Sequence, residues 1–486
     1  MVDKKILSIN LSHNAALTYV VGNEIIFHFE LDRYNRIKGN NFPSKQVIDL
    51  ICDTECDLII VTALNEDSYK LWEIIMCQSS KLANKIIKVP VHRNNEHHLL
   101  HAAEALAWGN FSNIIVADGR GVKLKGDLWE RESIFKFNDK KLFKKYYFDE
   151  QIGFIYEKRA FQIFNRQYFT EGKLMALSSY GENDNQWFNN KKLLENVNND
   201  KVKKSDKNYL NIATTTQNYI EERLTQIFTK IPQNEKIAFT GGVAQNVLAN
   251  SKLKKIYKKL FCSPYNNDSG ISIGSVNIYR NFDLKIKSIY TGIPQEFSSS
   301  CIPYPTKNVT LDEVCNLLEK EPVAIFKKRS ESGQRGLGAR SILISPCIKS
   351  SYEKMNEVKK RAWFRPFALS ILDEHGEEWF EDYFYTPFMM YIFNLKKNKK
   401  NILKNGLCIK GTSRIQSVRK EDNLEYYNLI HCFYKKTGIP MLVNTSFNLP
   451  GEVLVETYSD LNYFLKNSKL KYVYLAEYGK LIYANN

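Results

Sequence analysis

The 486-residue chain is 43% hydrophobic and 25% charged, the composition of a globular protein, and it is too long for one ordinary core. Its formal net charge of +16 suits polyanionic partners, although lysines mixed with asparagines also form a merely solvated basic surface. No apolar run approaches the ~20 residues that cross a bilayer, and the N-terminal apolar stretch lacks a cleavage site, so we expect a cytoplasmic protein without membrane contact.

The first elements alternate between strands and a helix. The segment ILSINLSHNAALTYVVGNEIIFHFE predicts two or three strands with a Gly-Asn turn, and it places His13 and Asn14 in a loop. A strand at DLIIVTA, a helix at HHLLHAAEALA and a strand at NIIVADG follow. This order predicts an α/β layer architecture. No internal repeat is visible in the sequence.

The helix HHLLHAAEALA concentrates histidines. His97 and His101 are four residues apart and share a helix face, whereas His98 points about 100° away. Such a pair is either half of a metal site or two polar groups on a half-buried helix. Asp118 and Asp268 each follow a short apolar stretch, and the four side chains together would suit divalent iron, manganese or zinc. Their spacing in the sequence does not show that they meet.

The middle of the chain contains a glycine motif and two polar stretches. KIAFTGGVAQNVLANSKL runs from a strand through Gly241 and Gly242 into a helix, which offers backbone amides to a nucleotide or simply packs tightly. The polar stretch 185–208 predicts an inserted helix or surface excursion, and the Ser- and Pro-rich stretch 288–308 predicts a boundary. We therefore expect domains at 1–295 and 296–486, the second beginning with a helix at LDEVCNLLEK and a strand at PVAIF.

The second domain is rich in cations near glycines and aromatic residues. ESGQRGLGARSIL holds Arg335 and Arg340, and the stretch NEVKKRAWFRPFALSIL and the stretch KGTSRIQSV add further basic residues. Small polar residues follow an apolar strand in GIPMLVNTSFNLPGE. Guanidinium groups presented in this way bind phosphates in bidentate fashion. Together these segments predict a phosphate-handling domain.

Ten motifs extend in order over nearly the whole chain: SHNAA, HHLLHAAEA, ADGRG, EGKLMALSSYG, FTGGVAQNVLAN, NNDSGISIG, RGLGARSIL, KKRAWFRPFA, KGTSRIQ and TGIPMLVNTSFNLPGE. In this order they resemble the O-carbamoyltransferases of the NodU/CmcH type, which modify nodulation factors and antibiotics. The resemblance implies an N-terminal actin-like (ASKHA) ATPase fold, similar to the tRNA threonylcarbamoyl-transfer protein, and a smaller C-terminal YrdC-like α/β domain. It implies that the C-terminal domain makes carbamoyl-adenylate and pyrophosphate from carbamoyl phosphate and ATP. The N-terminal domain would then transfer the carbamoyl group to an acceptor hydroxyl.

The resemblance also assigns residues, position by position. The metal ligands would be His97, His101, Asp118 and Asp268, with Fe(II) as the expected ion, and His98 would pack beside them. His13 would be the general base on the acceptor hydroxyl. The nucleotide contacts of the N-terminal domain would be Gly119, Gly241, Gly242 and Asn246.

In the C-terminal domain the YrdC-like signature reads Lys359 and Arg361, then Ser446 and Asn448. The signature residues, together with Arg335, Arg365 and Arg414, would neutralise the phosphates of both substrates. Mg(II) is a further candidate, as the companion of ATP.

The chain departs from the family pattern at several positions, and alternatives stay open. Within the arginine loop the departures are Ser332, Gln334, Gly336 and Ala339, and elsewhere they are Asn14 and Lys410. Family precedent favours a sugar or small natural product as acceptor, whereas the basic charge keeps a hydroxymethylated base in DNA open. A non-catalytic nucleic-acid-binding protein and a tRNA threonylcarbamoyl-type enzyme are the competing functions. The oligomeric state is not predictable.

Overall fold

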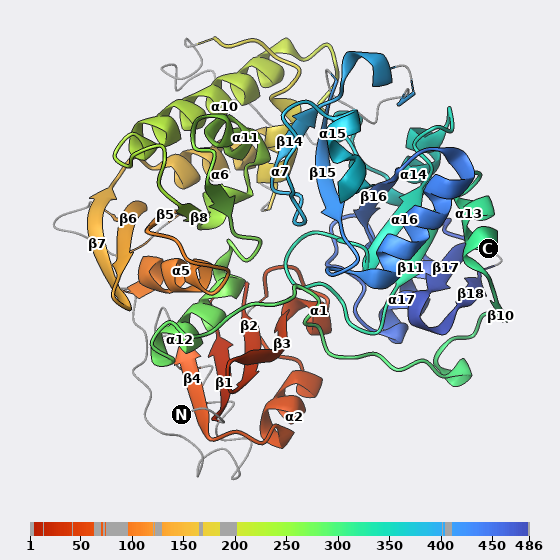
Figure 1. Ribbon diagram of the computed structural model, residues 1–486, viewed down its shortest axis with the longest axis horizontal. Helices are drawn as coiled ribbons and strands as arrows, with labels where there is room; N and C mark the ends of the chain where they lie inside the picture. Colours follow the sequence, from red (N-terminus) through yellow and green to blue (C-terminus); the bar gives the residue numbers. More distant parts are fainter. Residues whose placement is uncertain are drawn as a thin grey trace.

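The computed structural model describes residues 4–12, 14–40, 42–62, 70, 73, 96–119, 121, 129–164, 169–184, 202–400, 402–403 and 411–484. These residues form three β-sheets with flanking helices, which confirms the α/β prediction (Figure 1). Two sheets and their helices form what we call the N-terminal unit, up to residue 279, and the third forms the C-terminal unit, from residue 306. Within the described part of the chain, no helix has the length and apolar character that a membrane span requires.

The first sheet has the strand order β3-β2-β1-β4. Its members are β1 (Lys5–Asn10), β2 (Ala16–Val21), β3 (Glu24–Glu30) and β4 (Leu58–Thr62). The first three form an antiparallel meander, as predicted, and β4 lies parallel to β1. Two short helices, α1 (Asp32–Asn35) and α2 (Lys45–Asp53), lie between β3 and β4 in the sequence.

The second sheet has the order β7-β6-β5-β8-β9. Its members are β5 (Asn113–Ala117), β6 (Glu132–Asn138), β7 (Lys141–Phe148), β8 (Ile237–Thr240) and β9 (Leu260–Cys262). It again begins with a three-stranded antiparallel meander, followed by parallel strands. The strand order is therefore similar in the two sheets although the sequence shows no repeat, because strand pairing depends on apolar pattern rather than on residue identity. This N-terminal α/β unit is where the resemblance to O-carbamoyltransferases implies an actin-like ATPase fold.

Two helices fill the space between these sheets (Figure 1). α12 (Ile271–Tyr279) contacts the first sheet, and α5 (His97–Leu106) contacts β5 and β8 of the second. The helices touch at Gly274, where any Cβ would overlap the carbonyl oxygen of Leu100. Glycine at this position thus allows α5 and α12 to approach closely.

More helices cover the second sheet. They are α6 (Ile152–Ile163), α7 (Glu171–Leu177), α10 (Lys207–Phe228) and α11 (Val247–Ile256), with the 3-10 turns η2 (Gly242–Gln245) and η3 (Asp268–Gly270) near the strand ends. Their apolar side chains share one hydrophobic core with side chains of the C-terminal sheet. The polar excursion predicted at 185–208 lies mostly outside the described residues.

The C-terminal unit is built on a nine-stranded mixed sheet with the order β10-β18-β17-β11-β12-β16-β13-β15-β14. The strands are β10 (Thr306–Asn308), β11 (Val323–Phe326), β12 (Arg340–Ile344), β13 (Ala368–Leu372), β14 (Ile392–Asn394), β15 (Thr412–Val418), β16 (Met441–Ser446), β17 (Tyr472–Leu475) and β18 (Lys480–Tyr483). The helices are α13 (Leu311–Leu318), α14 (Ser351–Lys359), α15 (Gly376–Trp379), α16 (Leu424–Thr437) and α17 (Tyr458–Lys466). The helix and strand predicted at its start are confirmed as α13 and β11.

Candidate metal centre and anion-binding cluster

The structure brings together the four side chains suggested as metal ligands. His97 and His101 lie on the first turns of α5, Asp118 follows β5, and Asp268 begins η3 just before α12. One nitrogen or oxygen atom from each lies within 4.8 Å of the others. The close packing of α5 against α12 therefore converts remote sequence positions into one buried cluster.

The size of the cluster fits a metal ion. Ligands bound at ~2.1 Å to one tetrahedral ion lie ~3.4 Å apart. His101 Nε2 lies 3.3 Å from Asp118 Oδ2 and 3.4 Å from Asp268 Oδ1, and His97 Nε2 lies 2.8 and 3.6 Å from the same two atoms. Neither ring nitrogen of buried His101 makes a hydrogen bond to any described residue. An orphaned imidazole between two carboxylates is what a divalent ion would satisfy.

The charges in the cluster also call for a cation. Burial lowers the pKa of His101, but the facing carboxylates of Asp118 and Asp268 outweigh burial and raise it to about 10. Burial opposes ionisation of Asp118 as well, yet the two histidines hold the pKa of that carboxyl well below its usual range. The site therefore stabilises positive charge between its carboxylates, supplied either by protons or by a metal.

His98 lies outside this cluster. Its Nδ1 is 2.8 Å from the hydroxyl of Ser133, and burial holds its pKa well below the usual value. The side chain of His98 thus packs against β6, on a different face of α5 from the two candidate ligands.

The glycine loop after β8 borders the metal cluster. The backbone N–H groups of Gly119 and Gly242 both donate to Asp118 Oδ1, at 2.8 and 3.2 Å. Gly241 adopts a φ of +86°, and a Cβ there would overlap the carbonyl of Ala117. β5 and β8 are parallel, so the loops at their carboxyl ends meet, which is where open α/β sheets bind their ligands.

The side chain of Asn246 is already hydrogen-bonded within the protein and is not free to contact a nucleotide. Its side-chain oxygen caps α11 by accepting from the N–H of Ala249 at 3.1 Å, and its amide is paired with Gln217. Any role of Asn246 in nucleotide binding would therefore pass through the position of the loop. His13 and Lys410 lie outside the described residues.

The C-terminal unit gathers the predicted cations. Lys359, at the end of α14, donates to the carbonyl of Ser446 and to the side-chain oxygen of Asn448, both at 2.7 Å, and also to the carbonyl of Asn448. Arg361 donates to the hydroxyl of Thr445 at 2.7 Å. The two halves of the YrdC-like signature, far apart in sequence, are thus in direct contact.

These cations face one another without acidic partners. We call Arg335, Lys359, Arg361, Arg365 and Arg414 the cation cluster; among the described residues none of them forms an ion pair. Burial, followed by the neighbouring arginines, lowers the pKa of Lys359 well below its usual value and that of Arg335 to about 10. Lys359 is buried and the four arginines are half-buried, so their charges lie close together and would be offset by an anion such as a polyphosphate.

Arg340 is not part of the cation cluster, contrary to the phosphate-binding role expected of the whole arginine loop. Its buried guanidinium donates to the carbonyls of Lys327 and Glu456, at 2.7 and 3.0 Å, and stacks on the Phe326 ring. Arg340 is the first residue of strand β12, so its backbone belongs to the sheet rather than to the loop. Its partners are distant in sequence, which is why local pattern did not reveal them.

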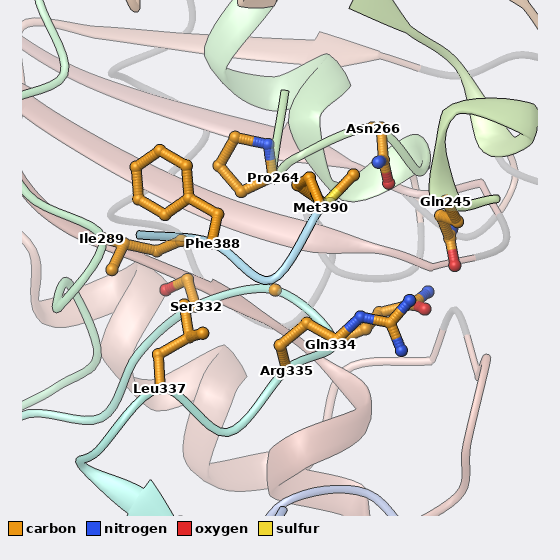
Figure 2. A pocket seen from close by; sticks show the side chains of 11 residues that line it. Gln245, Pro264, Asn266, Ile289, Ser332, Gln334, Arg335, Leu337, Phe388 and Met390 are labelled. Carbon is orange, nitrogen blue, oxygen red and sulfur yellow. The ribbon is translucent and has the colours of Figure 1, made fainter. Parts of the chain in front are cut away.

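A cleft between the units contains Arg335 of the cation cluster (Figure 2). Arg335 lines it from the C-terminal unit, and Gln245 and Asn266 line it from the N-terminal unit. Asn266 is only 3% exposed, and its Nδ2 makes no hydrogen bond to any described residue. Neither amide was predicted from the sequence; the one available signal was the position of Asn266 two residues before Asp268.

Two family models match this chain. The family description "Carbamoyltransferase N-terminus" matches residues 60–200 and 185–276, and "Carbamoyltransferase C-terminus" matches residues 314–480. An uncharacterized protein of Methanocaldococcus jannaschii is 28% identical over 95% of this chain and 96% of its own length. Nodulation protein NolNO of Sinorhizobium fredii is 25% identical over 92% of this chain and 76% of its own.

The 3'-hydroxymethylcephem-O-carbamoyltransferase of Amycolatopsis lactamdurans is 29% identical over 50% of this chain and 49% of its own. Among solved structures, full-length HypF in its phosphate- and nucleotide-bound form shows a weak similarity, with a TM-score of 0.35 and 13% identity over 57% of this chain and 55% of that one.

Proposed function

This chain belongs to the carbamoyltransferase family, and on that premise we propose that it is an ATP-dependent O-carbamoyltransferase. The observation that carries the proposal is the pairing, in one chain, of a cation cluster with no ion pair to any described residue and a buried cluster of two histidines and two aspartates. The first suits chemistry on polyphosphates, and the second suits transfer of a carbonyl group.

In the proposed first half-reaction, carbamoyl phosphate loses its phosphate to water, and the resulting carbamate oxygen attacks the α-phosphorus of ATP. Carbamoyl-adenylate, pyrophosphate and phosphate are the products, which balances the atoms. Lys359 is held rigidly by Ser446 and Asn448, so its charge is preorganised for the phosphates. The arginines of the cation cluster would stabilise the charge that develops on the departing pyrophosphate.

In the proposed second half-reaction, an acceptor oxygen attacks the carbamoyl carbon, AMP leaves, and His13 takes the hydroxyl proton. His97, His101, Asp118 and Asp268 would hold a divalent ion, with Fe(II) as our proposal, that supplies Lewis acidity toward a carbonyl or phosphate oxygen. The loop at Gly241 would lie against the nucleotide, with Asp118 holding the N–H groups of Gly119 and Gly242 on either side of it. Asn246 would fix the position of this loop.

The test is pyrophosphate release by purified protein given ATP and carbamoyl phosphate but no acceptor. We expect release to depend on carbamoyl phosphate, to be lost in Lys359→Ala and to survive in His97→Ala. Threonine with bicarbonate replaces carbamoyl phosphate in a parallel reaction, and release there alone would identify a threonylcarbamoyl-type enzyme instead. Absence of pyrophosphate in both reactions would refute the proposal.

For the acceptor we propose a hydroxyl of a sugar or small natural product, with a hydroxymethylated base in DNA as a second candidate. The second rests on the net charge of +16 and on β7, an edge strand of the second sheet. Phe143 of β7 is 54% exposed and pairs with exposed Lys136, and Lys141 and Lys145 flank it. Exposed rings among lysines suit stacking on nucleic-acid bases.

Binding of a labelled single-stranded oligonucleotide at several salt concentrations separates the two acceptors. A DNA-acting enzyme should show a steep salt dependence and weaker binding in Phe143→Ser than in the control Tyr463→Ser, whose ring is 55% exposed on α17. Equal binding by the two variants would favour the small-molecule acceptor.

A further inference from the structure

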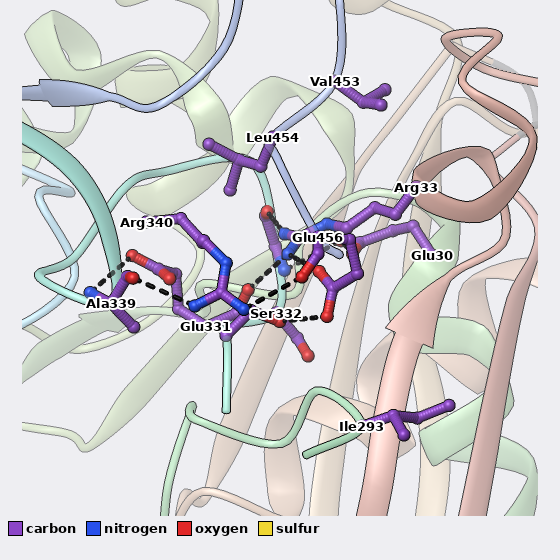
Figure 3. A network of polar contacts seen from close by, with 12 residues as sticks. Glu30, Arg33, Ile293, Glu331, Ser332, Ala339, Arg340, Val453, Leu454 and Glu456 are labelled. Atoms are coloured by element: carbon purple, nitrogen blue, oxygen red, sulfur yellow. Dashed lines mark hydrogen bonds and ion pairs between the residues drawn. The ribbon is translucent and has the colours of Figure 1, made fainter. Parts of the chain in front are cut away.

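Arg33 of the N-terminal unit is buried against the loop that carries Arg335 (Figure 3). Its guanidinium donates to the backbone carbonyls of Glu331 and Gly333, at 2.7 and 2.6 Å. It also forms ion pairs with Glu30, at 3.3 Å, and with Glu456, at 3.2 Å. A residue of α1 thus binds the main chain of the other unit while its charge is balanced by one carboxylate from each unit.

Glu30 completes this contact from the end of β3. Its carboxylate accepts a hydrogen bond from the N–H of Gly333 at 2.8 Å. Both polar backbone groups of Gly333 are therefore held by the N-terminal unit, through Glu30 and Arg33. Gly333 has a φ of +91°, a conformation that glycine adopts readily, and Arg335 lies only two residues beyond it.

The other end of the loop is fastened within the C-terminal unit. The buried carboxylate of Glu331 accepts from the N–H groups of Leu337 and, at 3.3 Å, Ala339. These bonds close the loop at its base and leave Arg335 near its tip, in the cleft between the units. The direction of the tip is therefore set by the contacts of Glu331 and Gly333 with Arg33 and Glu30.

The cation cluster gives a reason for this fastening. Arg365 and Arg335 repel each other, and the repulsion adds to burial in lowering the pKa of Arg335. Lys359 and Arg361 are tied to oxygen atoms of neighbouring residues, whereas Arg335 stands on a loop containing three glycines. Because this loop is the most flexible of these segments, repulsion would displace Arg335 first, unless residues outside the loop hold it in place.

We propose that Arg33, supported by Glu30, is a positioning residue that holds Arg335 in the cation cluster. The N-terminal unit thereby completes a binding site of the C-terminal unit, and full anion affinity requires the two units to be docked. Under the proposed function, adenylate formation would then occur only where the transfer centre is present to receive the product. This last step rests on the proposed function, whereas the positioning of Arg335 does not.

The experiment measures binding of inorganic pyrophosphate to the full-length protein by calorimetry, without ATP or carbamoyl phosphate. Arg33→Lys keeps the buried charge but cannot reach the two carbonyls and two carboxylates together. The matched control is Arg36→Lys: Arg36 also crosses between the units, but it donates to the carbonyls of Leu454 and Val453, away from the loop. Arg335→Ala and the double variant Arg33→Lys/Arg335→Ala complete a cycle, and thermal melting checks the fold of each.

We expect Arg335→Ala and Arg33→Lys each to weaken pyrophosphate binding about tenfold. The double variant should bind no more weakly than Arg335→Ala, and Arg36→Lys should stay within about twofold of the wild type. Additive losses, an unaffected Arg33→Lys, an equal loss in Arg36→Lys, or a wild type that does not bind pyrophosphate would overturn the proposal.

Glu30→Gln, which removes the charge next to Arg33, should weaken binding in the same direction and serves if Arg33→Lys does not fold. A wild type that binds pyrophosphate but releases none from ATP would refute the proposed function alone.

Discussion

Replacing His97 or His98 by alanine, one at a time, should show which of the two binds metal and which only packs in the core. Both are buried and adjacent on α5, but only His97 faces Asp118 and Asp268. Sites with four ligands bind zinc with an apparent ~10–16 kcal/mol, so one ligand is worth ~2.5–4 kcal/mol, or about 10²–10³ in the dissociation constant. His97→Ala should lose divalent-metal affinity by that factor, whereas His98→Ala should lose stability but keep the metal.

The assay is metal content by mass spectrometry after dialysis against a weak chelator, followed by titration with Fe(II), Mn(II) and Zn(II). His98→Ala is the matched control because it removes an imidazole of equal size whose partner is Ser133 rather than an aspartate. Equal metal loss in the two variants, or a wild type that binds no more metal than His97→Ala, would show that the cluster is held by protonated histidine instead.

Three further predictions follow from the packing and the charges. Pyrophosphate at ~100 times its dissociation constant should stabilise the wild type by ~2.7 kcal/mol, because it offsets the unopposed cation cluster; in thermal melts Lys359→Met should show a smaller shift, and an equal shift would argue against phosphate binding there. Gly274→Ala should lower the melting temperature and the metal content together, since its Cβ would displace α5 at Leu100; melting and metal analysis check this, and normal metal content would show that α5 tolerates the shift. Burial raises the pKa of Glu132 to about 8, above the ~4.3 of an unfolded chain, so the folded state keeps a proton that the unfolded state loses. Stability should therefore fall between about pH 5 and pH 8, and urea denaturation should show a smaller fall in Glu132→Gln; an unchanged pH dependence would assign the effect to another group.

Local patterns in the sequence were enough for several of the elements and for the types of ligand they carry. Short apolar runs and a Gly-Asn turn marked β1, β2 and β3, and the spacing of His97 and His101 placed two imidazoles on one helix face. These features depend on residues within a few positions of one another, where the helix and strand periods fix the geometry. The ordered motifs added the family and, with it, the kind of reaction.

Only the tertiary structure decided which of these groups meet. Asp118 and Asp268 join the histidines because α5 packs on α12 through Gly274, and no local period encodes that contact. Arg340 matched the pattern of a phosphate ligand as well as Arg335 did, yet one is buried with Glu456 and the other faces the cleft. The difference lies in which carboxylates and carbonyls the fold brings to each guanidinium. The contact of Arg340 with Glu456 joins residues more than a hundred positions apart in the chain, and no local sequence pattern predicts such a contact.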